Sequence, residues 1–265
     1  MNSILDVDQG AALLMTSVGE ARRLGIPEDR WVYLWGCGDA TDRWFFTERA
    51  DFHTSPAIRA CGERALGMAG VTIDDITHFD LYSCFPSAVQ IAMDMLGIDR
   101  GDPRPLTVTG GLPYFGGPGN NYVTHSIAAM ADKLRTDRGQ LGLVTANGWY
   151  VTKHSTGIYS TDPPQGEWQR TTPKTDQAQI DAGPQPTFTD TPSGDATVET
   201  YTVLFDRDGA PERGIVIGRL PDQRRFIANT PTDRTTLESM TKHEMIGTTG
   251  AVHVAEDGTN IFTPA

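Results

Sequence analysis

The spacing of apolar residues changes twice along the chain, and each change marks a different kind of structure. Before about residue 160, helical spacing alternates with short apolar runs. Residues 161–195 are dense in Pro, Gln, Thr, Asp and Gly, which is typical of a linker or an extended strap. From residue 196 the pattern is a series of short alternating runs bounded by turns. The sequence therefore predicts an α/β domain over 1–160, a linker over 161–195 and a β-barrel domain over 196–265.

The first part alternates segments of helical and of strand-like spacing. Ser55 followed by Pro56 is a typical helix start, because serine caps the free amides and proline is pre-shaped for the first turn. The expected helices are Gln9–Leu24, Ser55–Ala69, Ser87–Leu96 and Thr124–Leu134, and the expected strands are Trp31–Trp35, His78–Leu81 and Gln140–Thr145. Helices alternating with apolar strands favour a layered α/β sheet.

The last part reads as five short strands with a helix of about residues 234–242 between the third and the fourth. That order is the OB-fold arrangement, and an SH3-like barrel is the nearest alternative. OB-folds often bind oligonucleotides, but the formal net charge of −12 argues against a nucleic-acid partner, which requires a basic face.

Several other classes of protein are also disfavoured. We expect no membrane span, because no stretch is apolar over the necessary length. The first ten residues have neither a basic nor an apolar signal region, so the expected location is cytoplasmic. Cys37, Cys61 and Cys84 form no C-x-x-C pair, which argues against both a zinc site and a disulfide framework.

Four segments of the first part are informative in series. They are DVDQGAALLMTS (6–17), DLYSCFPSAV (80–89), TGGLPYFGGPGNNYVTHSIAAM (109–130) and VTANGWYVTKH (144–154). In this order and spacing the chain resembles the C-terminal part of the thiolase superfamily, most closely the lipid-carrier-type and thiolase-like branches. The resemblance covers roughly the first 160 residues, and the predicted barrel resembles the extra OB-like domain of some thiolase-like proteins. Residues 6–17 look like the last strand and helix of the family's N-terminal domain.

The resemblance implies acyl-CoA chemistry, but the family's catalytic groups are missing from their expected positions. Thiolases use a cysteine from the N-terminal half, a histidine in a G-H-P motif and a second cysteine in a C-x-G-G-G motif. This chain lacks the N-terminal half, has Gly117 at the histidine position, and reads Ala146-Asn147-Gly148 where the second cysteine belongs. We therefore expect no thiolysis by this chain alone. The start at a family motif suggests a truncated product or a split gene.

Two tyrosines occupy suggestive places. Tyr82 replaces the Asn or His that helps hold the thioester oxyanion in the family, and Tyr122 follows the Gly-rich loop at the start of a helix. This is similar to thiolase-fold retro-aldolases that cleave steroid side-chain CoA thioesters with a tyrosine pair and an OB-fold partner. A phenol can donate a proton to a developing enolate. Buried tyrosines also commonly serve only in packing, so both interpretations stay open.

The remaining candidates are weaker. His125 lies one turn from Tyr122 and is a reserve base, and His154 beside Lys153 is placed to meet a CoA phosphate or a carboxylate. The free amides of a Gly-rich turn can bind an anion, which makes Gly116, Gly117, Gly119 and Asn120 candidate cofactor-binding residues. Cys84 and Cys37 are expected to be packing residues, since free cysteines are usually small buried hydrophobes.

The sequence thus predicts a thiolase-like acyl-CoA acyltransferase homologue that acts on a carbon–carbon bond next to a thioester. A retro-aldolase subunit and a non-catalytic partner-binding subunit are the alternatives. No tightly bound cofactor is expected, with a coenzyme A thioester as substrate. The expected partner is a second copy in a homodimer or a separately encoded N-terminal half, because a thiolase without that half exposes an apolar surface.

Overall fold

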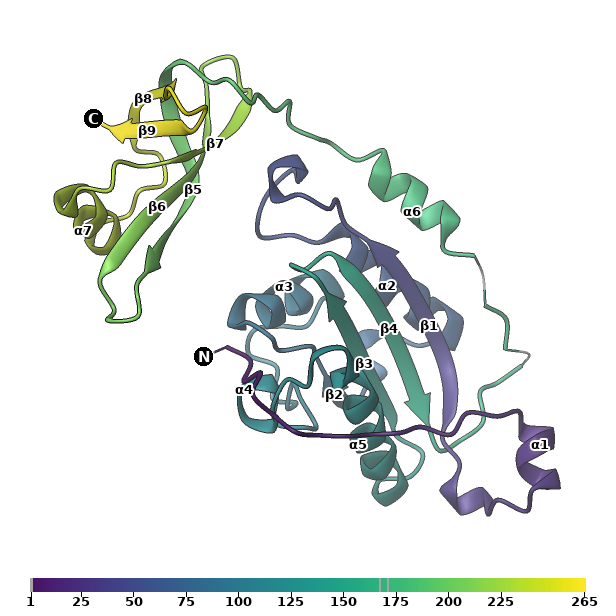
Figure 1. The fold of residues 1–265 in the computed structure, drawn as a ribbon. Coiled ribbons are helices and arrows are strands. Elements are labelled where there is room, and N and C mark those ends of the chain that lie inside the picture. Colours follow the sequence, from purple (N-terminus) through teal and green to yellow (C-terminus); the bar gives the residue numbers. More distant parts are fainter. Residues whose placement is uncertain (1, 167, 171) are drawn as a thin grey trace. The chain divides into compact units, whose positions relative to one another are not determined.

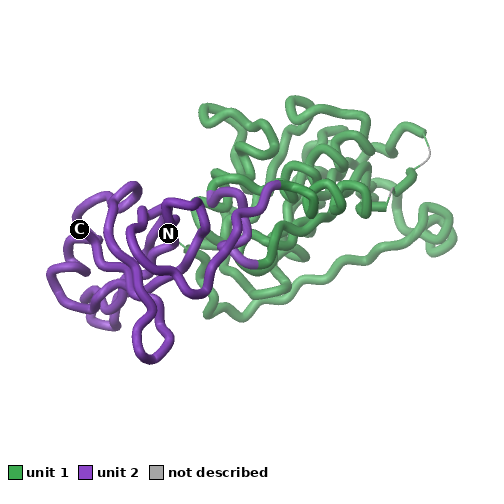
Figure 2. The backbone as a smooth tube through the Cα atoms, turned by 90° about the horizontal axis from the view of Figure 1, so that it is seen from above, with its two compact units in different colours: residues 1–44, 53–183 green, residues 45–52, 184–265 purple. Residues whose placement is uncertain are grey.

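The computed structural model describes residues 2–166, 168–170 and 172–265, and these form two compact units (Figure 2). One unit comprises residues 1–44 and 53–183, and the other comprises residues 45–52 and 184–265. Two features of this division were not predicted. Residues 45–52 group with the barrel, and most of the expected linker, up to residue 183, groups with the α/β unit. Positions 167 and 171 of that linker lie outside the described residues.

The first unit is built on a four-stranded mixed sheet in the order β1-β4-β3-β2 (Figure 1). The strands are β1 (Tyr33–Thr41), β2 (His78–Asp80), β3 (Leu141–Gly148) and β4 (Lys153–Ser160). β2 and β3 are parallel, while β4 pairs antiparallel with β3 on one side and β1 on the other. β4 was missed because its sequence, with Gly157 among polar residues, lacks the apolar run of a buried strand.

Helices cover both faces of this sheet. The helices of the unit are α1 (Val18–Arg23), α2 (Pro56–Ala69), α3 (Pro86–Leu96), α4 (Leu112–Phe115), α5 (Tyr122–Thr136) and α6 (Lys174–Asp181). α2 and α3 pack against Leu143 and Ile158 on one face, whereas α5 packs against Val144 on the other. Neighbouring residues of a strand point to opposite faces, so β3 is buried on both sides. The layered α/β fold is therefore confirmed.

Short 3-10 helices connect these elements in the described part of the chain. They are η1 (Glu28–Arg30), η3 (Ile73–Asp75) and η4 (Gly119–Asn121) in the first unit and η2 (Phe46–Glu48) in the second.

The predicted helix Gln9–Leu24 is wrong for most of its length. Residues 2–17 carry no helix or strand, so the expected strand and helix at 6–17 are also absent. The helix begins only at Val18, where the Ser17 side chain caps the amide of Glu20 at 3.2 Å. Upstream, the Ser3 amide donates to the Cys84 carbonyl, and the Ile4 carbonyl accepts from the Gly117 amide. At the start of the predicted helix, the Gln9 side-chain amide donates to the Phe115 carbonyl at 2.7 Å. Long-range pairing overrides local helical spacing here.

The expected linker also contains structure. Helix α6 packs on the first unit, where Asp176 forms an ion pair with Arg64 at 2.5 Å and the Gln177 side chain donates to the Thr41 carbonyl at 2.9 Å. This helix has no buried residue, so its sequence carries none of the apolar periodicity that predicts a helix.

The contact between β1 and α2 depends on glycines. A Cβ atom added at Gly38 would lie 2.4 Å from the Cys61 carbonyl oxygen, and one at Gly36 would lie 2.1 Å from that of Ala65. Both obstacles are backbone atoms, which cannot rotate away. The Trp35-Gly36-Cys37-Gly38 run is therefore explained by close packing of a helix on a strand.

The second unit is a closed five-stranded barrel in the order β5-β6-β7-β9-β8. Its elements are β5 (Gly194–Phe205), β6 (Pro211–Arg219), β7 (Arg225–Asn229), α7 (Arg234–Lys242), β8 (Thr249–Val254) and β9 (Asn260–Pro264). The helix lies between the third and fourth strands, and β7 meets β9 in a parallel bridge. The predicted small OB-like barrel is confirmed. Its core includes Val216, Phe226 and Phe262, each fully buried.

Arg225 explains why residues 45–52 belong to the barrel unit. Its side chain is completely buried and pairs with Glu199 at 2.6 Å. It also donates to the carbonyls of Thr47, Arg49 and Ala50 and lies over the Phe52 ring at 4.9 Å. A buried guanidinium needs all of these acceptors, because an unpaired buried charge is strongly destabilising.

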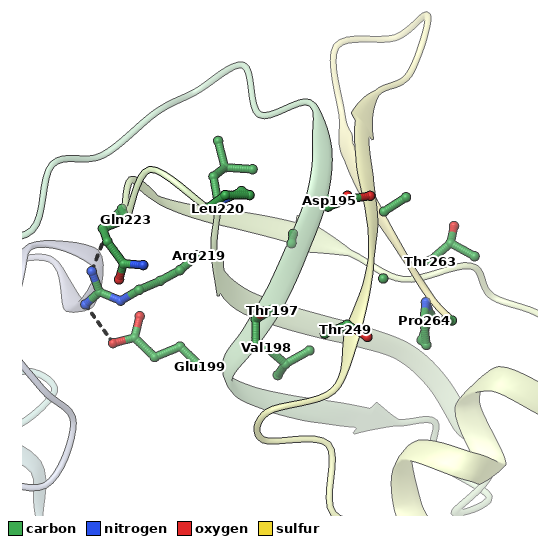
Figure 3. A pocket seen from close by; sticks show the side chains of 15 residues that line it. Asp195, Thr197, Val198, Glu199, Arg219, Leu220, Gln223, Thr249, Thr263 and Pro264 are labelled. Carbon is green, nitrogen blue, oxygen red and sulfur yellow. Dashed lines mark hydrogen bonds and ion pairs between the residues drawn. The ribbon is translucent and has the colours of Figure 1, made fainter.

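A groove of about 950 Å³ runs along the barrel between β5, β8 and the loop after β6 (Figure 3). Its cation, Arg219, is already paired with Glu199 at 2.9 Å and donates to the Gln223 carbonyl at 3.0 Å. A guanidinium committed to two acceptors is a poor anion receptor, so the groove is not where we place the site for a phosphorylated ligand.

The glycine requirement at β1 is directly testable. We expect Gly38→Ala to destabilise the protein by about 1–3 kcal/mol, because the new methyl group overlaps a helix carbonyl. Gly67→Ala in α2 is the matched control. It meets nothing within 4 Å and should stabilise the helix by about 1 kcal/mol. Urea unfolding measures the free energy of unfolding of both variants. An equal change in that free energy for Gly38→Ala and Gly67→Ala would contradict the packing argument.

Candidate active site

Asp80 organises the rim of the sheet where β2 ends. Its carboxylate is fully buried, and hydrogen-bond donors surround both oxygens. Oδ1 accepts from the Tyr122 hydroxyl at 2.9 Å and the Ser126 hydroxyl at 2.7 Å. Oδ2 accepts from the amides of Val108 and Thr109 at 3.0 Å each, and from the Thr109 hydroxyl at 3.0 Å. These bonds tie β2, the 108–109 loop and α5 together.

Tyr122 belongs to this network and does not offer its hydroxyl to solvent. The residue is 0% exposed, and its oxygen also lies 2.8 Å from Thr109 Oγ1. Burial, together with the neighbouring Asp80 carboxylate, raises the pKa of the Tyr122 phenol. A phenol that keeps its proton and donates it to a carboxylate is a structural group. The catalytic role of Tyr122 stays a prediction, and the burial of its hydroxyl against Asp80 does not favour it.

Tyr82 lies beside Tyr122 but in a different environment. The two rings meet edge to face with centroids 5.2 Å apart, so the predicted pair does come together. The Tyr82 amide donates to Thr145 Oγ1 at 2.9 Å, which fixes the backbone against β3. Burial, and to a lesser extent Cys84, raises the pKa of the half-buried Tyr82 phenol. Within residues 2–166, 168–170 and 172–265, no hydrogen-bond partner reaches its hydroxyl.

His125 extends the same ring cluster. It packs against Phe115 with centroids 5.4 Å apart, and Phe115 packs on Tyr122 at 6.0 Å. Its Nε2 lies 3.2 Å from the Asn121 side-chain amide. The structure therefore brings Tyr82, Tyr122 and His125 together, and their catalytic roles stay predictions.

The Gly-rich loop uses its amides internally. Gly116 donates to the Leu112 carbonyl at 3.2 Å, Gly117 to Ile4 at 2.7 Å, and Gly119 to the Gly117 carbonyl at 2.7 Å. Asn120 is exposed on the adjoining turn. Glycine is required here because the N-terminal segment approaches closely, and a Cβ atom at Gly117 would lie 2.0 Å from Ser3 Oγ. The predicted anion-binding role of this loop stays untested, and the three glycine amides already have acceptors.

The three thiols are not activated as nucleophiles. Burial raises the pKa of each of them, and that of Cys61 rises to about 12. Cys84 Sγ lies 3.5 Å from the Asn147 side-chain amide. Since the thiolate is the reactive species, these cysteines are predominantly protonated at neutral pH, in line with the packing role expected for Cys37 and Cys84.

His154 is not on the surface, where a CoA phosphate could reach it. Its side chain is 3% exposed, and its Nε2 lies 3.5 Å from Asp42 Oδ2. The sequence interpretation was wrong because β4 was not recognised, and the strand turns His154 inward under α2. Sequence reasoning also missed Asp42, which carries no recognisable motif.

Asn147 and His154 are direct cross-strand partners in β3 and β4. Residues opposite each other in a sheet point to the same face, so both side chains lie on the α2 and α3 side. Together with Tyr82 they line a small cavity beneath Ile58 and Ala92. The candidate site is therefore the end of β2 and β3, with Tyr82 and Asn147 as its polar groups.

Comparisons with known proteins agree with this architecture. Residues 176–259 match the family model of the additional C-terminal domain of thiolase-like protein type 1. A crystal structure of a monomeric SCP2-thiolase-like protein type 1 from Mycobacterium smegmatis superposes with a TM-score of 0.86 at 43% sequence identity. The match covers 94% of this chain. The chain belongs to the thiolase superfamily.

This thiolase-superfamily chain carries the additional C-terminal domain as its barrel. It spans 54% of the length of the solved Mycobacterium smegmatis protein, so it corresponds to about half of that protein. No curated protein matches the chain. Among the described residues, no helix is long and apolar enough to cross a bilayer, and no cluster of three or more His, Cys, Asp or Glu residues is placed to hold a metal ion.

The Asp80 network generates a testable expectation. We expect Asp80→Asn to lower the free energy of unfolding by about 2–4 kcal/mol, because the amide turns a donor toward groups that are themselves donors. Asp94→Asn is the control, since Asp94 forms an exposed ion pair with Arg100 and should leave stability unchanged. Thermal and urea unfolding measure both variants. Equal stability of the two would mean that Asp80 does not organise the rim.

Proposed function

We propose that this thiolase-like chain handles an acyl-CoA thioester at the end of β2 and β3, and acts on the carbon–carbon bond next to the thioester without a cysteine nucleophile. The observation that carries the proposal is the Tyr82 hydroxyl, which has no partner within the described residues and stands at the position that polarises the thioester in the family. The coenzyme A thioester is a substrate in this account, and no tightly bound cofactor is needed.

The chemistry follows from what a phenol can do beside a thioester. Breaking or forming the bond next to the carbonyl places negative charge on the thioester oxygen as an enolate. A positioned hydroxyl stabilises that charge more than it stabilises the ground state, which is the condition for catalysis. The raised pKa of Tyr82 suits a proton donor, because the phenol stays protonated at neutral pH.

A retro-aldolase, which is a lyase, is the second candidate, and the same tyrosine favours it. In a 3-hydroxyacyl-CoA, removal of the hydroxyl proton breaks the adjacent carbon–carbon bond and gives a carbonyl product and an acyl-CoA enolate. Proton return to the enolate completes the reaction with no thiol involved. The raised pKa values of Cys37, Cys61 and Cys84 are consistent with such a cysteine-free route.

The proposed partner is a second copy of the chain or a separately encoded N-terminal thiolase-like half. Apolar side chains of the N-terminal segment support it, because Leu5, Leu14 and Met15 are 73%, 82% and 80% exposed. Exposed apolar groups gathered on one segment favour an interface. A subunit that only binds such a partner, with no catalysis, is the third candidate.

Thiolysis separates the proposal from ordinary thiolase activity. We expect the purified chain to show no thiolysis of acetoacetyl-CoA or longer 3-ketoacyl-CoA substrates, because Gly117 and Ala146 stand where catalytic groups belong and groups that act as a unit do not replace one another. Turnover that iodoacetamide abolishes would show that Cys84 or Cys37 is a nucleophile and would overturn the cysteine-free account. Thiolysis restored by an added N-terminal half would instead identify a split thiolase.

The role of Tyr82 is tested by removing one oxygen atom. We expect Tyr82→Phe to lower retro-aldol turnover of 3-hydroxyacyl-CoA by roughly two to four orders of magnitude, while stability changes by about 1 kcal/mol. Tyr114→Phe is the matched control, because Tyr114 is 79% exposed on α4 and should change neither quantity. The product aldehyde or ketone and unfolding curves are measured in parallel. Equal turnover of both variants would remove Tyr82 from the chemistry.

A further inference from the structure

Strand β1 lies at an edge of the four-stranded sheet, and β4 is its only partner among the described strands. The Thr41 amide donates to Gln177 Oε1 at 2.8 Å, and the Thr41 carbonyl accepts from Gln177 Nε2 at 2.9 Å, so both groups point away from β4. Backbone groups alternate in direction along an antiparallel strand, so the amides of Cys37 and Asp39 face the same open side. No described residue forms a hydrogen bond with these two amides.

The segment 161–183, which we call the strap, lies along this open edge of β1 (Figure 1). Its contacts with β1 occur in the same order along both segments. They are Trp35 Nε1 to the Asp162 carbonyl at 2.8 Å, Asp39 to Arg170, and Thr41 to Gln177. The shared order means that the strap runs parallel to β1 and covers its edge. Proteins commonly protect an exposed strand edge with a helix or a loop.

Polar contacts provide most of the attachment of the strap. Asp176 of α6 pairs with Arg64 at 2.5 Å, and Asp39 pairs with Arg170, with all four side chains partly exposed. Ion pairs at such exposure are weak, and salt screens them. Ile180 supplies the apolar contact of α6, against the cluster of Ala40, Ala57 and Cys61. An isolated helix of eight residues is unstable in water, so α6 should form only while the strap is attached.

We propose that the strap is a releasable cover of the β1 edge, and that the uncovered edge pairs with β1 of a second copy of this chain. The released strap leaves the outward amides and carbonyls of β1 free to form a strand ladder with another chain. Local release of this kind does not require the rest of the unit to unfold. The inference goes beyond the proposed function, because neither Tyr82 nor a thioester takes part in it.

The charge of β1 determines how two copies can pair. An interface between identical copies is two-fold symmetric, so two β1 strands related in this way pair antiparallel. Asp39 is the one charged residue of β1. An axis at Asp39 would place two carboxylates opposite each other, which is destabilising. An axis at Cys37 avoids this, because each Asp39 then faces no charged residue of the other β1 strand.

The test uses the full chain with Asp176→Asn and Gln177→Ala together, which remove the ion pair and the side-chain amide contact of α6. Asp94→Asn is the matched control, because Asp94 forms an exposed ion pair with Arg100. Hydrogen exchange over 174–181 measures release, and light scattering after gel filtration measures mass. We expect faster exchange over 174–181 only in the double variant, and dimerisation about tenfold tighter than in the control. High salt should increase exchange over 174–181 in the unaltered chain.

A short bismaleimide cross-linker locates the interface. Pairing about Cys37 places the Cα atoms of the two Cys37 residues about 5.5 Å apart, so the linker should join them in the double variant. Adding Cys37→Ser should abolish that product while the dimer remains in light scattering. Unchanged exchange over 174–181 would overturn the claim that these contacts hold the strap. A released strap on a monomeric chain, equal dimerisation of variant and control, or a dimer not joined at Cys37 would overturn the pairing.

Discussion

The buried carboxylate of Asp80 is the constraint on which the rest of the α/β unit depends. It accepts hydrogen bonds from side chains of α5 and from the backbone of the 108–109 loop, so three distant segments converge at the end of β2. A buried anion without a cation is tolerated only when donors surround it. Satisfying Asp80 therefore fixes where α5 begins and where Tyr82, two residues further on, leaves the sheet. The candidate site is a consequence of that arrangement.

Tyr82 and Tyr122 differ in chemical capacity because only Tyr122 is hydrogen-bonded to the Asp80 carboxylate. Tyr122 donates to Asp80 and is buried, whereas the hydroxyl of Tyr82 has no partner among the described residues. Two residues of one type in ring contact thus have different chemical capacities, set by their surroundings. A symmetrical tyrosine pair acting as acid and base does not follow from this geometry. A single phenol with a hydroxyl that no described residue engages fits it better.

The sequence was sufficient to predict those helices and strands whose local residue pattern agrees with their tertiary packing. The Ser55-Pro56 start of α2, the apolar run of α3 and the alternating strands of the barrel all form as predicted. The helix expected at Gln9–Leu24 shrinks to Val18–Arg23, and at its expected start the Gln9 side chain instead donates to the Phe115 carbonyl beside the Gly-rich loop. β4 and α6 carry too little apolar periodicity to be recognised.

The candidate site was only partly predictable for a related reason. Family motifs located Tyr82 and the Gly-rich loop, but burial decides what each group can do, and burial depends on strands that pair across long sequence separations. Asp42 and His154 illustrate the limit, since 112 residues separate them in the chain. Their proximity requires β1 and β4 to be neighbours in the sheet, and no local pattern encodes that pairing.

The central claim is that a thioester is held by Tyr82 and that no cysteine bonds to it. The most direct measurement is a crystal structure of the chain, with its partner if one is needed, in complex with a non-cleavable acyl-CoA thioether or amide analogue and with a reactive acyl-CoA. The account predicts the carbonyl oxygen of the acyl group within hydrogen-bond distance of the Tyr82 hydroxyl and all three thiols unmodified. An acyl group bonded to Cys84 or Cys37, or a ligand seated away from the end of β2 and β3, would contradict it.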